Sequence, residues 1–191
     1  MGRTKTQRQK QAEIRYEKHR RQNVMAKPGV HDFVVVLDNL KPGFNVAKIF
    51  RSAQAFGAHS VHMINIGQFD PSPAKGAFKY VPAKFYEDFA SCYDYLKKEG
   101  YQLYILEPHN SELLHEISFP AKSAFVMGNE ELGISFDADA YPDIKRIAIQ
   151  QFGKVESLNV SIAASIVMYQ YCTVHNSKSW SLHSEGDEFL K

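Results

Sequence analysis

The run Phe33-Val-Val-Val-Leu37 is continuously apolar, as expected for a strand buried on both faces of a parallel sheet. A loop containing Pro42-Gly43 follows it. Apolar residues then recur at helical spacing on one stripe, namely Val46, Ile49, Phe50 and Ala53. Gly57 is placed to end that helix. A buried strand leading into an amphipathic helix is the repeating unit of α/β proteins.

Further strands and helices are expected to alternate along the rest of the chain. Strands are predicted at residues 59–65, 101–106, 123–127 and 146–150, and helices at residues 87–99 and 159–173. Between them, Gly67–Ala77 is a long loop, and loops of that length in compact domains are often functional or mobile. This order predicts an α/β fold with a mainly parallel sheet and helices on both faces.

The distribution of charge divides the chain. Its 191 residues suit one domain with a small appendage. Residues 1–28 are expected to form a basic N-terminal arm, helical only in part or only on a partner. Residues 29–175 would form the main domain and 176–191 a C-terminal tail of obscure role. Residues 1–27 hold nine Lys or Arg against two Glu, a formal charge of +7, whereas the remainder carries −5. Such an arm suggests a polyanionic partner, although it can equally be a solvated tail.

Composition indicates a cytoplasmic protein. The N-terminus is charged and lacks an apolar signal core, and the longest strongly apolar stretch, Val160–Tyr169, is too short to span a bilayer. Cys92 and Cys172 lie far apart without Cys-x-x-Cys spacing, so they are expected to be buried thiols in a reducing compartment. The eight histidines also lack the spacing of metal ligands, so no metal site is indicated.

Polar side chains gather where the predicted strands meet helices or loops, which is where ligands bind in parallel α/β sheets. At the first junction Asn45 lies near a helix start, where its simplest role is to cap the helix. Arg51 lies about 140° round the helix from Val46, off the apolar stripe. Taken alone, it is one more exposed surface arginine.

Two further junctions lie downstream. Gly128-Asn-Glu-Glu-Leu-Gly133 follows an apolar strand, and its glycines allow the backbone to approach a ligand closely. Seen alone, this hexapeptide is a plain strand-to-helix turn. The third junction is Val155-Glu-Ser-Leu-Asn-Val-Ser-Ile-Ala-Ala164. In it, Ser157 and Asn159 could simply cap the last helix.

Together the three junctions resemble the signature motifs of the SpoU/TrmH family of RNA ribose 2'-O-methyltransferases, over roughly residues 31–175. The resemblance implies a SPOUT fold with a deep C-terminal trefoil knot, and S-adenosylmethionine as cofactor. Arg51 matches the principal catalytic residue of the family. The other catalytic positions that match are Asn45, Glu130, Ser157 and Asn159. The positions that would bind the cofactor are Gly128, Asn129, Ile149 and Leu158.

The chemistry of arginine restricts what Arg51 can do. A guanidinium keeps its proton at ordinary pH and is a poor general base. It can grip a phosphate with a bidentate fork and stabilise the developing alkoxide of a ribose 2'-hydroxyl. We expect Arg51 to anchor the target nucleotide in this way, on tRNA or rRNA.

The last predicted helix carries apolar residues on two sides. One stripe is Val160, Ala163, Ala164, Val167 and Tyr171, and the nearly opposite one is Ile162, Ile166 and Tyr169. A helix that is apolar on two sides is buried on two sides. The second side would pack on another subunit, and the family resemblance also implies a homodimer. The alternative is a fully internal helix.

Two other functions remain open at this point. A catalytically silent RNA-binding protein with the same fold could act in ribosome assembly, although all signature residues are present. A nucleotide-binding oxidoreductase would require a Gly-x-Gly-x-x-Gly turn after the first strand, where Lys41-Pro42-Gly43 stands instead. Tyr80, Phe85 and Tyr86 could stack on unpaired bases or pack in the core.

Overall fold

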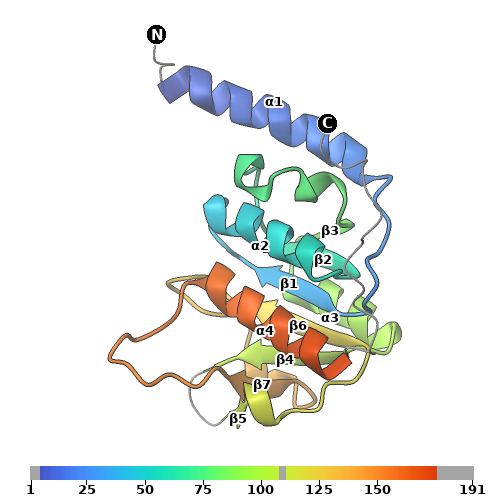
Figure 1. Ribbon diagram of the computed structural model, residues 1–191, viewed down its shortest axis with the longest axis vertical. Coiled ribbons are helices and arrows are strands. Elements are labelled where there is room, and N and C mark those ends of the chain that lie inside the picture. The colour runs from blue at the N-terminus through green and yellow to red at the C-terminus, as the bar shows by residue number, and fades with distance from the viewer. Residues whose placement is uncertain (1–4, 108–110, 176–191) are drawn as a thin grey trace, which may run out of the picture.

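The computed structural model describes residues 5–107 and 111–175, and within them seven parallel strands form one sheet of order β3-β2-β1-β6-β4-β7-β5 (Figure 1). The strands are β1 (Val34–Asp38), β2 (Ser60–Ile64), β3 (Ala83–Tyr86), β4 (Gln102–Leu106), β5 (Glu112–Leu113), β6 (Ser123–Met127) and β7 (Lys145–Ala148). The α-helices are α1 (Lys5–Asn23), α2 (Phe44–Ala55), α3 (Phe89–Lys98) and α4 (Val160–His175). Short 3-10 helices are η1 (Ser72–Ala74), η2 (Ala77–Lys79), η3 (Leu114–Glu116) and η4 (Ala138–Ala140).

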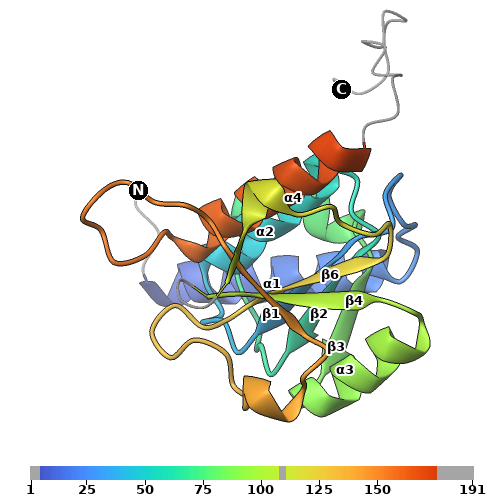
Figure 2. The same cartoon turned by 90° about the horizontal axis from the view of Figure 1, so that it is seen from below.

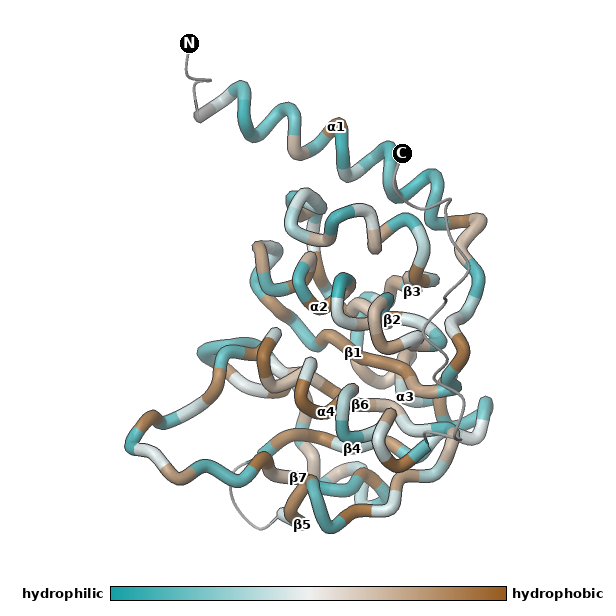
Figure 3. The backbone as a smooth tube through the Cα atoms, in the orientation of Figure 1, coloured by the Kyte–Doolittle hydropathy of each residue, from teal (hydrophilic) through white to brown (hydrophobic). Residues whose placement is uncertain are grey.

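Helices cover both faces of the sheet, as predicted (Figure 2). Side chains alternate along β1: Val35 and Leu37 join the core that contains α2 and α4, whereas Val34 and Val36 join the core that contains α3. The central strands are therefore apolar on both faces, and they appear as brown segments in the middle of Figure 3. The predicted α/β class and mainly parallel sheet are confirmed.

The strands that the prediction missed lie at the edges of the sheet. The strands β3 and β5 were not predicted. Every residue of β3 is at least partly exposed, and β5 is only two residues long. Edge strands lack the continuous apolar runs that mark central strands, so their pattern resembles a loop. The first strand also extends one residue beyond the prediction, so that Asp38 belongs to β1 and is fully buried.

The N-terminal arm forms the helix α1, which packs on the segment that carries η1 and η2. Tyr16 is 1% exposed, and its ring centroid lies 5.5 Å from that of Phe78 and 5.3 Å from that of Phe69. The rest of α1 is strongly polar and crosses the top of Figure 3 as a mostly teal helix. The expected tail of residues 176–191 lies outside the described residues.

The two apolar stripes of α4 have different surroundings. Val160, Ala164, Val167 and Tyr171 of the first stripe are buried in the core. On the second stripe Ile162 is 52% exposed and Tyr169 is 60% exposed. The alternative of a fully internal helix is therefore wrong for the single chain, because one apolar side is uncovered.

The cysteines are free thiols, as expected. Cys92 is buried, and burial raises its pKa to about 12. Cys172 is half-buried, and burial raises its pKa to about 11. Neither thiol is ionised near neutral pH, so neither is a ready nucleophile. None of the described helices is long and apolar enough to cross a bilayer.

Candidate functional site

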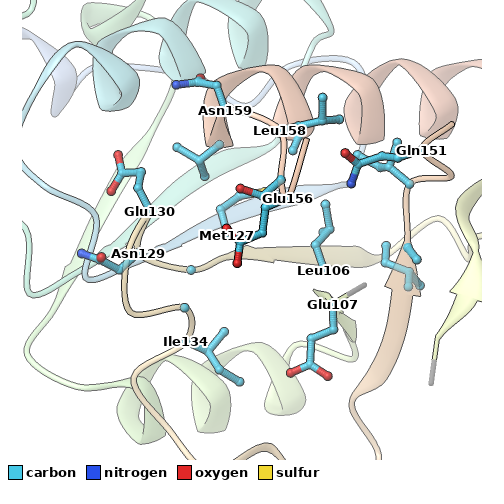
Figure 4. Close-up of a pocket in the computed structure, with 18 residues that line it drawn as sticks. Leu106, Glu107, Met127, Asn129, Glu130, Ile134, Gln151, Glu156, Leu158 and Asn159 are labelled. Atoms are coloured by element: carbon cyan, nitrogen blue, oxygen red, sulfur yellow. The ribbon is translucent and has the colours of Figure 1, made fainter. Parts of the chain in front are cut away.

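A cavity of about 440 Å³ opens at the carboxyl ends of three adjacent strands, β6, β4 and β7. Met127 ends β6, Leu106 ends β4 and Ala148 ends β7, and all three line the cavity (Figure 4). Residues 156–160, which lead into α4, close it from the other side. Ligands in parallel α/β proteins bind at this edge of the sheet, and the volume is within the usual range for a small-molecule site.

One wall of the cavity is a tight turn that begins at Gly128. Asn129 N–H donates to the Gly133 carbonyl at 2.7 Å, and Gly133 N–H donates back to Asn129 at 2.9 Å. A Cβ atom on Gly128 would lie 2.6 Å from the Gly133 carbonyl carbon and 2.7 Å from the Ile134 nitrogen. Position 128 therefore requires glycine, because two stretches of backbone touch there.

The side chain of Asn129 holds this turn against the sheet. Its Nδ2 donates to the Asn39 carbonyl at 2.7 Å, just past β1. Its Oδ1 accepts from the backbone N–H groups of Glu131 at 2.9 Å and Leu132 at 3.1 Å. Although Asn129 lines the cavity, its amide is committed to backbone partners, so it shapes the wall of the cavity.

Asp38 anchors the far end of the same loop, and sequence reasoning missed it. Its fully buried carboxylate accepts from Ser135 N–H at 2.6 Å and from Ser135 Oγ at 2.7 Å. Both bonds go to a charged acceptor and are of the stronger kind. The available signal was an acidic residue directly after the apolar run of residues 33–37, at the carboxyl end of a central strand.

The mouth of the cavity brings the three junctions together. Asn45 Nδ2 donates to Glu130 Oε1 at 2.8 Å, and Asn159 Nδ2 donates to Asn45 Oδ1 at 3.3 Å. These residues are separated by 85 and 114 positions in the chain. The backbone N–H of Lys41 also lies 3.4 Å from Glu130 Oε2. A connected polar group therefore faces solvent beside the apolar interior of the cavity.

The capping roles expected for two asparagines have different outcomes. For Asn45 the expectation is wrong: Gly43 is the N-cap of α2, and Asn45 lies inside the first turn with its amide turned toward Glu130. For Asn159 it is confirmed, because Oδ1 accepts from Ser161 N–H at 3.0 Å and Ser161 Oγ at 2.6 Å. Asn159 thus fixes the start of α4 and contacts Asn45 at once.

Eight of the nine residues predicted for the site gather at this cavity. Seven of them line it, namely Gly128, Asn129, Glu130, Ile149, Ser157, Leu158 and Asn159. Asn45 contacts two of those seven. Arg51 is the exception, because it is exposed and does not line the cavity. It lies six residues beyond Asn45 on α2, about 9 Å farther along the helix axis.

The walls of the cavity combine an apolar interior with carboxylates. The apolar part comes from residues such as Leu106, Ile147 and Leu158, while Glu107, Glu130 and Glu156 contribute acidic groups (Figure 4). This set suits a ligand with a flat apolar portion and positive charge. Within residues 5–107 and 111–175, no group of three His, Cys, Asp or Glu is arranged to hold a metal ion.

Comparison with known proteins agrees with this geometry. The model of the SpoU rRNA Methylase family matches residues 32–169. The tRNA (guanosine(18)-2'-O)-methyltransferase of Escherichia coli K12 is 32% identical over 145 residues, which cover 73% of this chain and 62% of that enzyme. The chain thus spans less than two thirds of that relative's length.

Solved structures share the fold. The TrmH/SpoU tRNA modifying enzyme of A. aeolicus superposes with a TM-score of 0.70 at 24% identity, covering 86% of this chain and 84% of its own. An AdoMet-bound rRNA methyltransferase from Sinorhizobium meliloti superposes with a TM-score of 0.69 at 20% identity, covering 82% and 61%. The chain therefore shares its fold with both of these enzymes.

Proposed function

Because the chain belongs to the SpoU rRNA methylase family, we propose that it is an S-adenosylmethionine-dependent RNA methyltransferase acting on a ribose 2'-hydroxyl of tRNA or rRNA. The observation that carries the proposal is the cavity itself. Three segments far apart in the sequence meet there, and eight of the nine residues that match the family's functional positions gather at it. The tRNA and rRNA methyltransferases named above are the kind of protein that this proposal describes.

The residues of the cavity fit S-adenosylmethionine. The Gly128 turn brings two stretches of backbone into contact and lets main-chain groups face a ligand directly. Leu106, Ile149 and Leu158 would hold the flat adenine, and carboxylates at the rim would favour the cationic end of the cofactor. When bound, the cofactor supplies an electrophilic methyl group on a sulfonium.

The protein's contribution is orientation and electrostatics. Asn45, Glu130 and Asn159 would position the target ribose at the mouth of the cavity through the polar group that they already form. Arg51 would grip the phosphate of the target nucleotide and stabilise the oxygen as its proton leaves. Ser157, exposed at the rim, completes the set of polar groups.

The uncovered side of α4 supports a homodimer. Ile162 and Tyr169 are exposed there, and Phe56, just past the end of α2, lies against Tyr169 with ring centroids 6.2 Å apart. A second copy packed on this face would bury the apolar stripe. Arg51 is on α2, whose Ser52 bonds Ser165 of α4 at 2.8 Å, so the dimer would place Arg51 beside the partner. Arg51 could then complete either subunit's cavity.

Two further features belong to the same proposal. We propose that the segment between β7 and α4 forms the trefoil knot of the SPOUT fold. The return of the chain from β7 across the cavity to α4, which joins the α2 core, supports this. We also propose a cytoplasmic location, because free thiols and RNA substrates suit a reducing compartment.

The test is methyl transfer to RNA. Total RNA from cells that lack the gene is incubated with the purified protein and radiolabelled S-adenosylmethionine. We expect labelled RNA in which the modified nucleotide resists alkaline cleavage, because a 2'-O-methyl group blocks attack by that oxygen. Arg51→Lys should lower turnover about 100-fold, the usual effect of removing a donor that stabilises developing charge. Cofactor binding without any transfer would favour the silent RNA-binding alternative, and label on a base would contradict ribose methylation.

Mixed dimers would show whether Arg51 serves the cavity of its own subunit or that of the partner. One subunit carries Arg51→Lys, and the other carries Ala163→Phe, which fills the cavity. Activity in the mixture means that Arg51 serves the partner's cavity, whereas inactivity means that it serves its own.

A further inference from the structure

A second hollow lies at the opposite edge of the sheet from the cavity, beside the C-terminal end of α1. It encloses about 510 Å³ and is lined by Gln22, Met25, Ala26, Lys27, Lys79 and Tyr80. We call it the α1 groove. One side comes from the end of α1 and the residues after it, and the other comes from η2, just before the edge strand β3. The proposed methyl transfer uses none of these residues.

The two sides of the α1 groove are fixed relative to each other. The 7%-exposed Asn23 donates from Nδ2 to the Phe78 carbonyl at 2.6 Å and to the Val81 carbonyl at 2.7 Å. Its Oδ1 accepts from Ala83 N–H at 3.0 Å. Tyr16 is buried against Phe78, so α1 is held at two points along its length, Tyr16 and Asn23. The backbone on the two sides of the groove is therefore positioned by the fold.

Exposed positive charge runs along α1 and reaches the α1 groove. Exposed cations on α1 and directly after it are Arg8, Lys10, Lys18, Arg20, Arg21 and Lys27, against the exposed acids Glu13 and Glu17. This positive charge affects a neighbouring titratable group. Burial lowers the pKa of His19, and the positive charges of Lys79 and Lys18 lower it further. Such a surface attracts polyanions.

One aromatic ring in the α1 groove is open to solvent. Tyr80 is 60% exposed, and the Lys79 ammonium lies 4.8 Å from its ring centroid. The two other aromatic residues that could have stacked on bases are engaged elsewhere. Phe85 is 38% exposed and has the guanidinium of Arg20 over one face of its ring at 4.3 Å, and Tyr86 packs against the core beneath α3. Of these three rings, Tyr80 is the most exposed and is the one that lines the α1 groove.

We propose that the α1 groove binds an unpaired nucleotide of the RNA substrate, with the base stacked on Tyr80 and the adjoining phosphates held by Lys27 and Lys79. The inference rests on the proposed function. It adds a second place, away from the cavity, at which the protein binds the RNA. An exposed aromatic ring in a positively charged groove is the usual design of a site for single-stranded nucleic acid. Duplex RNA offers its phosphates to such a surface but keeps its bases stacked out of reach.

Fluorescence anisotropy with a labelled single-stranded RNA of about ten nucleotides tests this, with a duplex of equal length as the comparison. Tyr80→Ala should weaken binding of the single strand by about fivefold or more, the effect of losing one base–aromatic stack. The matched variant Tyr80→Phe keeps the ring and should bind like the wild type. Replacing Lys27 and Lys79 together by Gln should reduce the slope of log affinity against log salt by about 1.4, for two phosphates. Lys98→Gln, an exposed lysine on α3, is the control for charge.

Thermal stabilisation by S-adenosylmethionine is measured in parallel on every variant. It should be unchanged, because the cavity is remote from the α1 groove, and this also shows that each variant is folded. Tyr80→Ala binding the single strand as tightly as the wild type would overturn the inference. So would Tyr80→Phe binding as weakly as Tyr80→Ala. If the wild type methylates RNA while Tyr80→Ala retains full affinity, only the inference fails. If the wild type transfers no methyl group to RNA, the proposed function fails as well.

Discussion

The cavity at the carboxyl ends of β6, β4 and β7 differs from the α1 groove in the groups that form it. Backbone turns form one wall of the cavity, and the polar side chains of the buried Asp38 and the half-buried Asn129 hold those turns. The α1 groove is made by exposed side chains on a helix and a loop, and its charged and aromatic groups point into solvent. The cavity therefore depends on exact backbone geometry, whereas the groove depends on the chemistry of a few side chains.

This difference determines how each site should respond to substitution. A buried hydrogen bond to a charged group contributes about 1.5–3 kcal/mol, and leaving its donor unpaired costs a similar amount. An exposed ion pair contributes about 0–1 kcal/mol. Changes in the walls of the cavity should therefore abolish binding or destabilise the fold, while changes in the α1 groove should be graded and leave the fold intact.

The largest effect is expected for Gly128→Ala. The added Cβ would meet the Gly133 carbonyl carbon at 2.6 Å, so the turn that forms one wall must open. We expect affinity for S-adenosylmethionine to fall about 100-fold, which corresponds to roughly 3 kcal/mol of strain. Isothermal titration calorimetry measures it. The control is Gly67→Ala, where a Cβ meets no atom within 4 Å. Unchanged affinity in Gly128→Ala would show that the turn is not part of the binding site.

A smaller effect is expected for Asp38→Asn. The carboxylate accepts both bonds from Ser135, whereas an amide accepts only one and would turn its NH₂ toward Ser135 Oγ, which must then change from donor to acceptor. We expect a loss of about 2–3 kcal/mol in the free energy of unfolding and weaker cofactor binding, measured by urea denaturation and calorimetry. Ser135→Ala, which keeps the bond from the backbone N–H, should cost about 1 kcal/mol. If both variants lose the same stability, the charge of Asp38 does not matter.

The sequence could predict the cavity far better than the α1 groove. The apolar runs at residues 33–37 and 123–127 mark strands buried on both faces, and polar residues directly after such strands meet at one edge of the sheet. The edge strands β3 and β5 carry no such pattern. The contact of Asn45 with Glu130 spans 85 residues, and spacing alone suggested only a local cap.

The α1 groove depends on packing that no local pattern encodes. Lys27 and Tyr80 are far apart in the chain and meet only because Tyr16 and Asn23 dock α1 on the η1–η2 segment. The sequence showed the basic charge of the arm and the aromatic residues separately. It could not show that Tyr80 would be more exposed than Phe85. The position of Arg51 relative to a second subunit is likewise a property of assembly.

The edge of the sheet below the α1 groove contains a buried histidine. His62 of β2 is 1% exposed, with Nε2 3.1 Å from Ser60 Oγ and Nδ1 3.6 Å from Cys92 Sγ. It pairs in register with Lys84 of β3, the strand whose first residue, Ala83, bonds Asn23 of α1. Burial, aided by the charge of Lys84, lowers the pKa of His62 to about 3. The two sites should therefore differ in their response to acid.

The neutral form of His62 is favoured in the fold, so its contribution to stability is present above the unfolded pKa of about 6.5 and is lost as pH falls toward 3. The free energy of unfolding should fall by about 2 kcal/mol by about pH 5. Urea denaturation between about pH 7 and pH 5 measures the loss. His62→Gln should reduce the slope of the free energy of unfolding against pH. A residual slope should remain, since burial also lowers the pKa values of His31 and His59. Hydrogen exchange at about pH 5 should show β2, β3 and α1 losing protection before β6. Equal loss of protection in β6 and in β2, β3 and α1, or an unchanged dependence of stability on pH in His62→Gln, would mean that acid does not act through this histidine.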